Sequence, residues 1–447
     1  MLSFYWMVFA LFVILLVAQW TVFFCVRNYI LARPSFRIRP RHLAYFVFSV
    51  AANLLMAILS INASWSAPDS MLRQSLSVSY FFYLGLCLCL FLFFVALAGF
   101  YSIFHVVRVG HRAAKSMIDG NLTELRAETK TDHSVTQVSS LSDPTGDQTQ
   151  IKLSRRAFMR YTASTGALAI VSSGSYGLIE AFETPRVNIL KFSDPSLDGL
   201  SRSVNIIQIT DLHFGMFYSE SALRDLIRRL NSIEADAVVV TGDIFHSPMT
   251  PVEPVGPMLR NLRKRPWGNF AVMGNHDFYA GVHRSVKTIQ DGGIRLLRNE
   301  WMTFDEGETK IHLGGIDDPR VNWLTGKEIP NFHEFIRKKP RAPGFYILLS
   351  HRPVVFPLAV KSGINLTLAG HTHGGQFTIP APGSDRPWSL AGLVSPYTLG
   401  LYESGQSRMY LNRGVGLTFV PARINCPPEI ALIRLEPPGK SVANTMG

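Results

Sequence analysis

The chain of 447 residues carries a formal net charge of +12, and 47% of its residues are hydrophobic. No run of basic residues with interleaved aromatics accompanies this charge, so we expect no nucleic-acid partner. The four cysteines form neither a disulfide framework nor a pattern of metal ligands, so cysteine usage leaves the compartment open.

The N-terminal part is too apolar for a soluble domain. Almost unbroken apolar runs cover residues 2–26, 43–61 and 78–107. Each is about 20 residues or longer, enough to cross the roughly 30 Å of hydrocarbon in a bilayer. The runs contain almost no charged residues that could form an ion path. Residues 1–107 are therefore predicted to form three transmembrane helices that anchor the chain in a lipid bilayer.

Loop charges predict the orientation of these helices. Five arginines lie between the first two runs, within residues 27–41, whereas only Arg73 lies between the next two. Basic loops favour the cytoplasmic side, so the segment after the third run is expected in the cytoplasm. Most of residues 108–153 lack the large apolar side chains that folding requires, which indicates a flexible cytoplasmic linker.

The stretch "SRRAFMR", which contains Arg155 and Arg156, resembles a twin-arginine export signal. A run rich in Ser, Thr and Gly follows, so residues 154–183 are predicted to be a signal and a fourth, weaker span. The Tat export machinery would then be a partner, and the rest of the chain would face the periplasm or exterior. If the segment is instead a membrane-surface helix or a linker, the rest stays cytoplasmic.

Residues 184–447 have a different sequence pattern from the N-terminal part. Short β-rich runs such as "VNIIQIT" and "FYILLSH" alternate with helical stretches such as "ALRDLIRRLNSI". This alternation predicts an α/β domain with a largely buried sheet.

Polar residues of the same kinds follow five of these apolar runs. They are Asp211 and His213 in "QITDLHFG", Asp243 in "VVVTGDIFH", Asn275, His276 and Asp277 in "AVMGNHDFYAG", His351 in "ILLSHRP", and His371 and His373 in "LTLAGHTHGGQF". Strand-end loops are where α/β folds build their sites. Carboxylate, imidazole and amide groups together suit divalent ions such as Mn, Fe or Zn. Two such ions can hold a phosphoryl oxygen and a bridging hydroxide for in-line displacement.

This series of motifs resembles the calcineurin-like metallophosphoesterase family over about residues 200–435. The resemblance implies two mixed β-sheets sandwiched between helices, with a dinuclear metal site. It implies that one ion is bound by Asp211, His213 and His373, and the other by Asn275, His351 and His371, with Asp243 as the bridge. His276 would stabilise the transition state or protonate the leaving group, and Asp277 would orient its ring unless it only caps the loop.

The motifs "GHTHGGQ" and "GGIDDP" resemble those of a bacterial membrane-associated subgroup of the family. This subgroup includes Tat-exported phosphodiesterases and UDP-2,3-diacylglucosamine pyrophosphatases. We therefore expect a multi-pass protein of the bacterial inner membrane with an external catalytic domain. Its substrate would be a phosphodiester, diphosphate or phosphomonoester, small or lipid-linked, near the bilayer. A cytoplasm-facing lipid-precursor pyrophosphatase and a catalytically silent binding scaffold are the alternatives.

Five further residues lie near the motifs. Asp317 and Asp318 are expected in a turn, although they could line the site. His246 and His283 match no ligand position and are expected to be neutral surface histidines. Gln376 is a weaker candidate for substrate contact.

Overall fold

A computed structural model describes residues 81–83, 85–87, 89–93, 96, 155–248, 250–318, 332–384 and 386–438. The chain divides into two units, Met1–Val50 with Leu84–Ser172, and Ala51–Tyr83 with Ser173–Gly447. All strands of the described residues belong to the second unit. The predicted domain boundaries after residues 107, 153 and 183 stay predictions.

Helix α4 (Arg155–Ala181) occupies the segment predicted as an export signal and fourth span. Its sequence places Arg160 and Glu180 among many Ser, Thr and Gly residues, and charged groups are costly inside a bilayer. Across the described ranges, no helix combines the length and the apolar character that a membrane crossing demands. On these residues the transmembrane part of the predicted fold class, the fourth span and the multi-pass inner-membrane location are therefore wrong.

The three spans predicted at 2–26, 43–61 and 78–107 lie outside the described residues, apart from short helical stretches between 81 and 96. The predicted linker at 108–153 also lies outside them.

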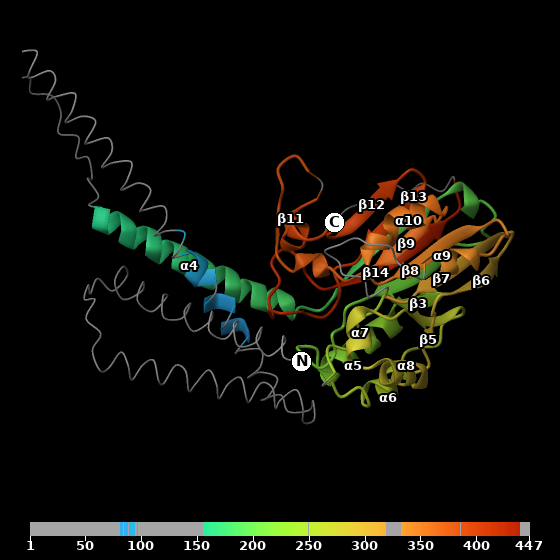
Figure 1. Ribbon diagram of the computed structural model, residues 1–447, viewed down its shortest axis with the longest axis horizontal. Coiled ribbons are helices and arrows are strands. Elements are labelled where there is room, and N and C mark those ends of the chain that lie inside the picture. The colour runs from blue at the N-terminus through green and yellow to red at the C-terminus, as the bar shows by residue number, and fades with distance from the viewer. Residues whose placement is uncertain are drawn as a thin grey trace, which may run out of the picture. The chain divides into compact units, whose positions relative to one another are not determined.

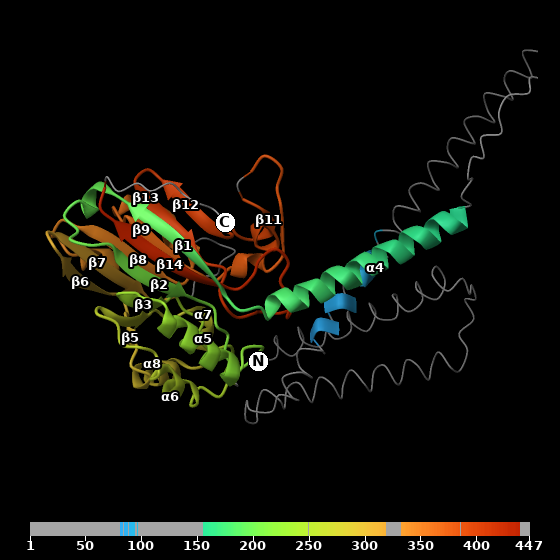
Figure 2. The ribbon, with the colours of Figure 1, turned by 180° about the vertical axis from the view of Figure 1, so that it is seen from behind.

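The α/β part of the prediction is confirmed by two mixed sheets of six strands each within the described residues. The first sheet has the order β1-β14-β2-β3-β4-β5. Its strands are β1 (Arg186–Ser193), β14 (Glu429–Glu436), β2 (Val204–Ile209), β3 (Ala237–Val240), β4 (Gly268–Ala271) and β5 (Arg295–Leu296). Strands β2 to β5 run parallel, whereas β14 lies antiparallel to β2 and parallel to the edge strand β1 (Figure 2).

The second sheet has the order β12-β13-β9-β8-β7-β6. Its strands are β12 (Gly400–Ser404), β13 (Ser407–Leu411), β9 (Leu366–Ala369), β8 (Phe345–Ser350), β7 (Thr309–Ile316) and β6 (Glu300–Glu306). The four central strands are parallel and the two edge strands pair antiparallel with their neighbours. A separate short hairpin consists of β10 (Thr378–Ile379) and β11 (Trp388–Ser389).

Apolar side chains on both faces of the central strands explain the sandwich. In β2, Ile206 belongs to the core between the sheets with Leu313 and Leu349, whereas Ile207 belongs to the core that contains Leu223 of a covering helix. Strands buried on both faces read as continuous apolar runs, as these do. The helices that follow the first sheet's strands are α5 (Glu220–Ser232), α6 (Val255–Leu259), α7 (Asn275–Tyr279) and α8 (Val282–Asp291). Those of the second sheet are α9 (Phe332–Arg337) and α10 (Phe356–Lys361) (Figure 1).

Truncating a side chain between the sheets is expected to destabilise the domain. Leu313 is fully buried there, so Leu313→Ala leaves a cavity and lowers the free energy of unfolding by about 2–5 kcal/mol. Urea titration measures this loss. Leu401→Ala on β12, where the side chain is 37% exposed, is the matched control and costs less than about 1 kcal/mol. Equal losses for both variants would contradict the assigned core.

Candidate metal centre

The polar residues that follow the apolar strands meet at one edge of the two sheets. Asp211 and His213 follow β2, and Asp243 follows β3. From the second sheet, His351 follows β8, and the loop after β9 brings His371 and His373. These are the carboxyl ends of parallel strands, so their loops converge, as the sequence predicts.

Five of these residues have a left-handed backbone. The φ angles are 54° at Asp211, 47° at His213, 54° at Asp243, 80° at His371 and 51° at His373. Non-glycine residues rarely adopt this region, and they persist there only where the surroundings hold them. Such outliers cluster at functional sites, so the backbone independently marks these loops as a candidate site.

Asp211, His213 and His373 form a first buried group. The Nε2 atoms of His213 and His373 lie 3.0 Å apart. The Oδ1 atom of Asp211 lies 3.4 Å from Nε2 of His373 and 3.9 Å from Nε2 of His213. All three residues offer one ligand atom each within a space that suits a metal ion.

Asp243, His351 and His371 form a second group of the same kind. Oδ2 of Asp243 lies 3.1 Å from Nε2 of His351, which lies 3.1 Å from Nδ1 of His371. The other ring nitrogen of His351 lies 2.8 Å from the backbone oxygen of Thr241. That carbonyl can only accept, so Nδ1 of His351 carries the proton when the ring is neutral, and Nε2 is left for a ligand bond.

Two buried oxygen atoms in this region have no hydrogen-bond donor. They are Oδ1 of Asp211 and Oδ1 of Asn275, the first residue of helix α7 (Asn275–Tyr279). Buried polar groups are normally satisfied, and a bound ion can satisfy such an acceptor among imidazoles. The donor set therefore fits divalent metal ions.

The electrostatics of three of the four imidazoles agree with this fit. Burial raises the pKa of Asp211 to about 6, and it lowers the pKa of His213, His371 and His373 well below the usual range, so these imidazoles are neutral and each keeps a lone pair that a metal ion could use. Burial alone would lower the pKa of His351, but the Asp243 carboxylate outweighs it and raises that pKa to about 10.

His276 and Asp277 lie in the same loop but have different contacts. The backbone N–H of His276 donates to Oδ1 of Asp243 at 2.8 Å, and Nδ1 of its half-buried ring contacts the backbone oxygen of His246. Asp277 is predicted to orient this ring. Its carboxylate instead accepts from the backbone N–H groups of Asp243, Gly274 and Phe245, at 2.8, 2.9 and 3.0 Å. Asp277 thus holds the loops together, in keeping with the alternative of a loop cap.

His246 is not the surface residue that the sequence predicts. It is half-buried, and its Nδ1 lies 3.2 Å from Nδ1 of His213. Burial and the neighbouring His276 lower the pKa of His246 to about 4, which keeps its ring neutral. The one available signal was its position three residues after Asp243 in the same loop. His283, by contrast, is exposed on α8.

The remaining candidates are engaged elsewhere. Asp317 is paired with Arg298 at 2.8 Å, and Asp318 forms a buried ion pair with Arg352 at 2.7 Å. Gln376 uses its side chain to hold the loop at 418–422, through Thr418 N–H at 2.7 Å and two backbone carbonyls.

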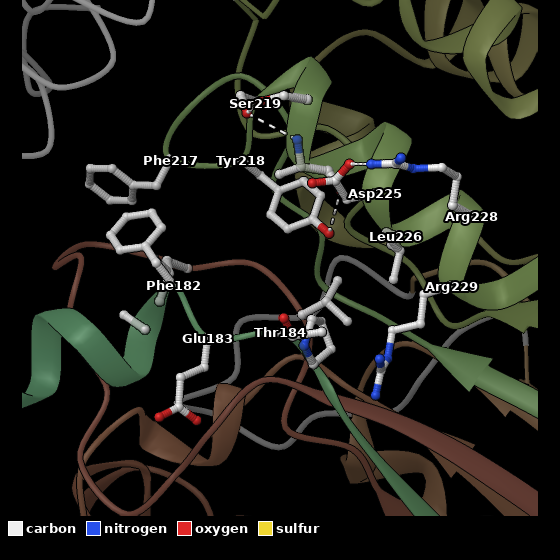
Figure 3. Close-up of a pocket in the computed structure, with 16 residues that line it drawn as sticks. Phe182, Glu183, Thr184, Phe217, Tyr218, Ser219, Asp225, Leu226, Arg228 and Arg229 are labelled. Atoms are coloured by element: carbon white, nitrogen blue, oxygen red, sulfur yellow. Dashed lines mark hydrogen bonds and ion pairs between the residues drawn. The ribbon is translucent and has the colours of Figure 1, made fainter.

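A cavity of about 710 Å³ lies along α5, and the candidate metal ligands do not line it. Figure 3 shows Phe182 and Phe217 on one side of it and Arg229 on another. Two described residues in its wall, Val415 and Leu417, flank Gly416, whose backbone N–H donates to the Asp211 carbonyl. The convergence of donor atoms, not the volume of this cavity, therefore identifies the candidate site.

Comparison with known proteins decides the family. The family model of calcineurin-like phosphoesterases matches residues 204–375. YkuE of Bacillus subtilis, an uncharacterized metallophosphoesterase, is 31% identical over 299 residues, covering 64% of this chain and 98% of YkuE. This chain belongs to the calcineurin-like phosphoesterase family. As a metallophosphoesterase it is a hydrolase that acts on phosphoester bonds, and its family is metal-dependent.

Other relatives are more distant. The phosphodiesterase YaeI of Escherichia coli is 26% identical over 297 residues, covering 63% of this chain and 99% of YaeI. Among solved structures, a 5'-nucleotidase precursor from Thermus thermophilus is 11% identical, with a TM-score of 0.31 over 52% of this chain. The chain spans about half of that structure, 54% of its length, and a TM-score this low adds nothing to the assignment.

Removing divalent metal is expected to destabilise the metallophosphoesterase domain. Ions bound by buried ligands stabilise only the folded state, by about 3 kcal/mol at a hundred times the dissociation constant. For a domain of this size, chelation should lower the melting temperature by about 5–10 °C, and Mn²⁺ should restore it. Differential scanning fluorimetry measures the shift. Asp243→Ala, which removes a carboxylate from the centre, serves as a control that should respond less. An unchanged melting temperature after chelation would contradict a buried metal centre.

Proposed function

We propose that this chain hydrolyses phosphoester bonds with two divalent ions, drawn from Mn, Fe and Zn, bound at the candidate centre. Asp211, His213 and His373 would hold one ion, and Asn275, His351 and His371 the other. When bound, the ions would supply Lewis acidity toward phosphoryl oxygens and would make water a stronger nucleophile at neutral pH.

The position of Asp243 carries this proposal. Its Oδ2 atom lies 3.6 Å from Nε2 of His213 in the first group and 3.1 Å from Nε2 of His351 in the second. One carboxylate oxygen is thus within reach of both groups, as a bridging ligand must be. Burial alone would raise the pKa of Asp243, but His351 holds it well below the usual range, so the carboxylate stays charged.

His276 is the candidate for proton transfer. Its Nδ1 faces a backbone carbonyl, which can only accept, so Nδ1 carries a proton and Nε2 is left for the reacting group. In the doubly protonated form, this half-buried imidazole can use its Nε2–H to stabilise charge on a phosphoryl oxygen, or it can donate that proton to the departing oxygen.

A phosphodiester of a small molecule is the substrate class we propose first. The support is the relationship to YaeI, whose name describes a phosphodiesterase. Phosphomonoesters and diphosphates use the same displacement at phosphorus, so a substrate panel must contain all three classes.

Loss of a proposed ligand is expected to abolish turnover. Asp243→Asn and His371→Ala should each lower kcat/KM for bis-p-nitrophenyl phosphate by more than about 100-fold in the presence of Mn, Fe or Zn, because even indirect contacts to a metal matter by 10–100-fold. Far-ultraviolet circular dichroism verifies folding. Asp291→Asn, an exposed carboxylate on α8, is the control with unchanged activity. Full activity in either ligand variant would refute the site.

Removing the His276 ring is expected to lower kcat by about 10²–10⁴-fold while the metal content stays the same. Metal content is read by mass spectrometry and kcat by release of the alcohol product. If His276 donates a proton, the loss is larger for a substrate with a poor leaving group, such as a methyl ester, than for a nitrophenyl ester. A His276→Ala variant with wild-type kcat on both substrates would exclude both roles.

A further inference from the structure

The His246 residue is held beside the metal-facing loops by the backbone. Beyond the ends of β2 and β3, His213 N–H donates to the Asp243 carbonyl at 3.0 Å, and Phe214 N–H donates to that of Ile244 at 2.9 Å. The next bond runs the other way, from His246 N–H to the Phe214 carbonyl at 3.2 Å. This short parallel ladder places His246 at a defined distance from His213.

The two rings meet through their Nδ1 atoms, 3.2 Å apart, with their centroids 5.4 Å apart. The other nitrogen of His213, Nε2, points toward His373 and Asp243. A neutral imidazole has one N–H and one lone pair. If Nε2 of His213 presents its lone pair to a metal, Nδ1 must carry the proton and requires an acceptor. The Nδ1 atom of His246 is at the right place to accept it.

The same residue also contacts His276. Its backbone oxygen faces Nδ1 of His276, and the two rings stack with centroids 5.2 Å apart and an interplanar angle of 24°. His246 therefore contacts a proposed metal ligand with its ring and the proposed proton donor with its backbone.

We propose that His246 is a positioning residue of the metal centre, whose Nδ1 accepts the proton of His213 Nδ1 and so directs the lone pair of His213 Nε2 toward the metal. The inference rests on the proposed metal-dependent function. Metal-bound histidines usually donate their second N–H to a carboxylate, a carbonyl or water, and such partners strengthen metal binding. In this chain a second imidazole takes that place.

A separate ion bound by His213, His246 and His276 is the competing explanation, since one ligand atom from each lies within 4.8 Å of the others. His213 has a single lone pair when neutral, and the first metal group uses it at Nε2. A further ion at Nδ1 would require the ring to lose its remaining proton. The hydrogen bond is the simpler arrangement, and metal stoichiometry distinguishes the two.

The test compares three substitutions at His246 by titrating metal-free full-length protein with Mn²⁺ and with Co²⁺, without any substrate. The amide of Asn reaches the ring position of Nδ1, whereas that of Gln reaches the position of Nε2. We expect His246→Ala to raise the dissociation constant of one ion about 10–100-fold. His246→Asn should recover most of the affinity, and His246→Gln should not. His283→Ala, on the exposed face of α8, is the control with wild-type affinity.

Several outcomes would overturn the proposal. Wild-type affinity in His246→Ala would do so, as would equal affinities of the Asn and Gln variants. Three ions per wild-type chain and two in His246→Ala would replace it with a third metal site. If His246→Ala fails to fold, the comparison of Asn with Gln decides alone. A wild-type chain that binds no divalent ion would refute the proposed function itself, which a failure at His246 would not.

Discussion

The loops of the candidate metal centre depend on the hydrogen bonds that the Asp277 carboxylate accepts. It is fully buried and accepts backbone N–H groups from Asp243 and Phe245 after β3, and from Gly274 after β4. These bonds bring the two loops so close that a Cβ atom on Gly274 would lie 2.1 Å from Oδ1 of Asp243. The strained backbone of Asp243 is therefore held by a neighbouring loop. This fixes the position of the Asp243 carboxylate before any ion binds.

A second support lies beneath the first metal group. The guanidinium of Arg423, fully buried, donates to the carbonyl groups of Arg413, Gly414, Gly416 and Cys426. The loop that it organises donates in turn to the end of β2, through Gly416 N–H to the Asp211 carbonyl at 2.9 Å. Because one rigid guanidinium donates to several carbonyl groups at once, this C-terminal loop is held in a fixed position next to Asp211.

Strand-end patterns were enough to predict the α/β class and to bring six ligand candidates to one edge, because the carboxyl ends of parallel strands converge. The twin-arginine-like motif misled the prediction for α4, because the sequence of this helix contains Arg160, Glu180 and many small polar residues. The directions of the side chains also could not be predicted from the sequence. Asp277 binds backbone N–H groups, Gln376 binds the backbone of a loop, and His246 contacts His213. These contacts depend on which atoms face one another across loops, and spacing along the chain does not determine that.

The placement of β14 bears on how this domain is made in the cell. That strand lies between β1 and β2, and Arg434 on it donates to the side chain of Asn205, a residue 229 positions earlier. During translation, β2 is therefore complete long before its partner has been synthesised, and it keeps an unpaired edge that is prone to aggregation. Asp211 and His213 directly follow β2, so their half of the centre acquires its final support only when synthesis of the domain is nearly finished.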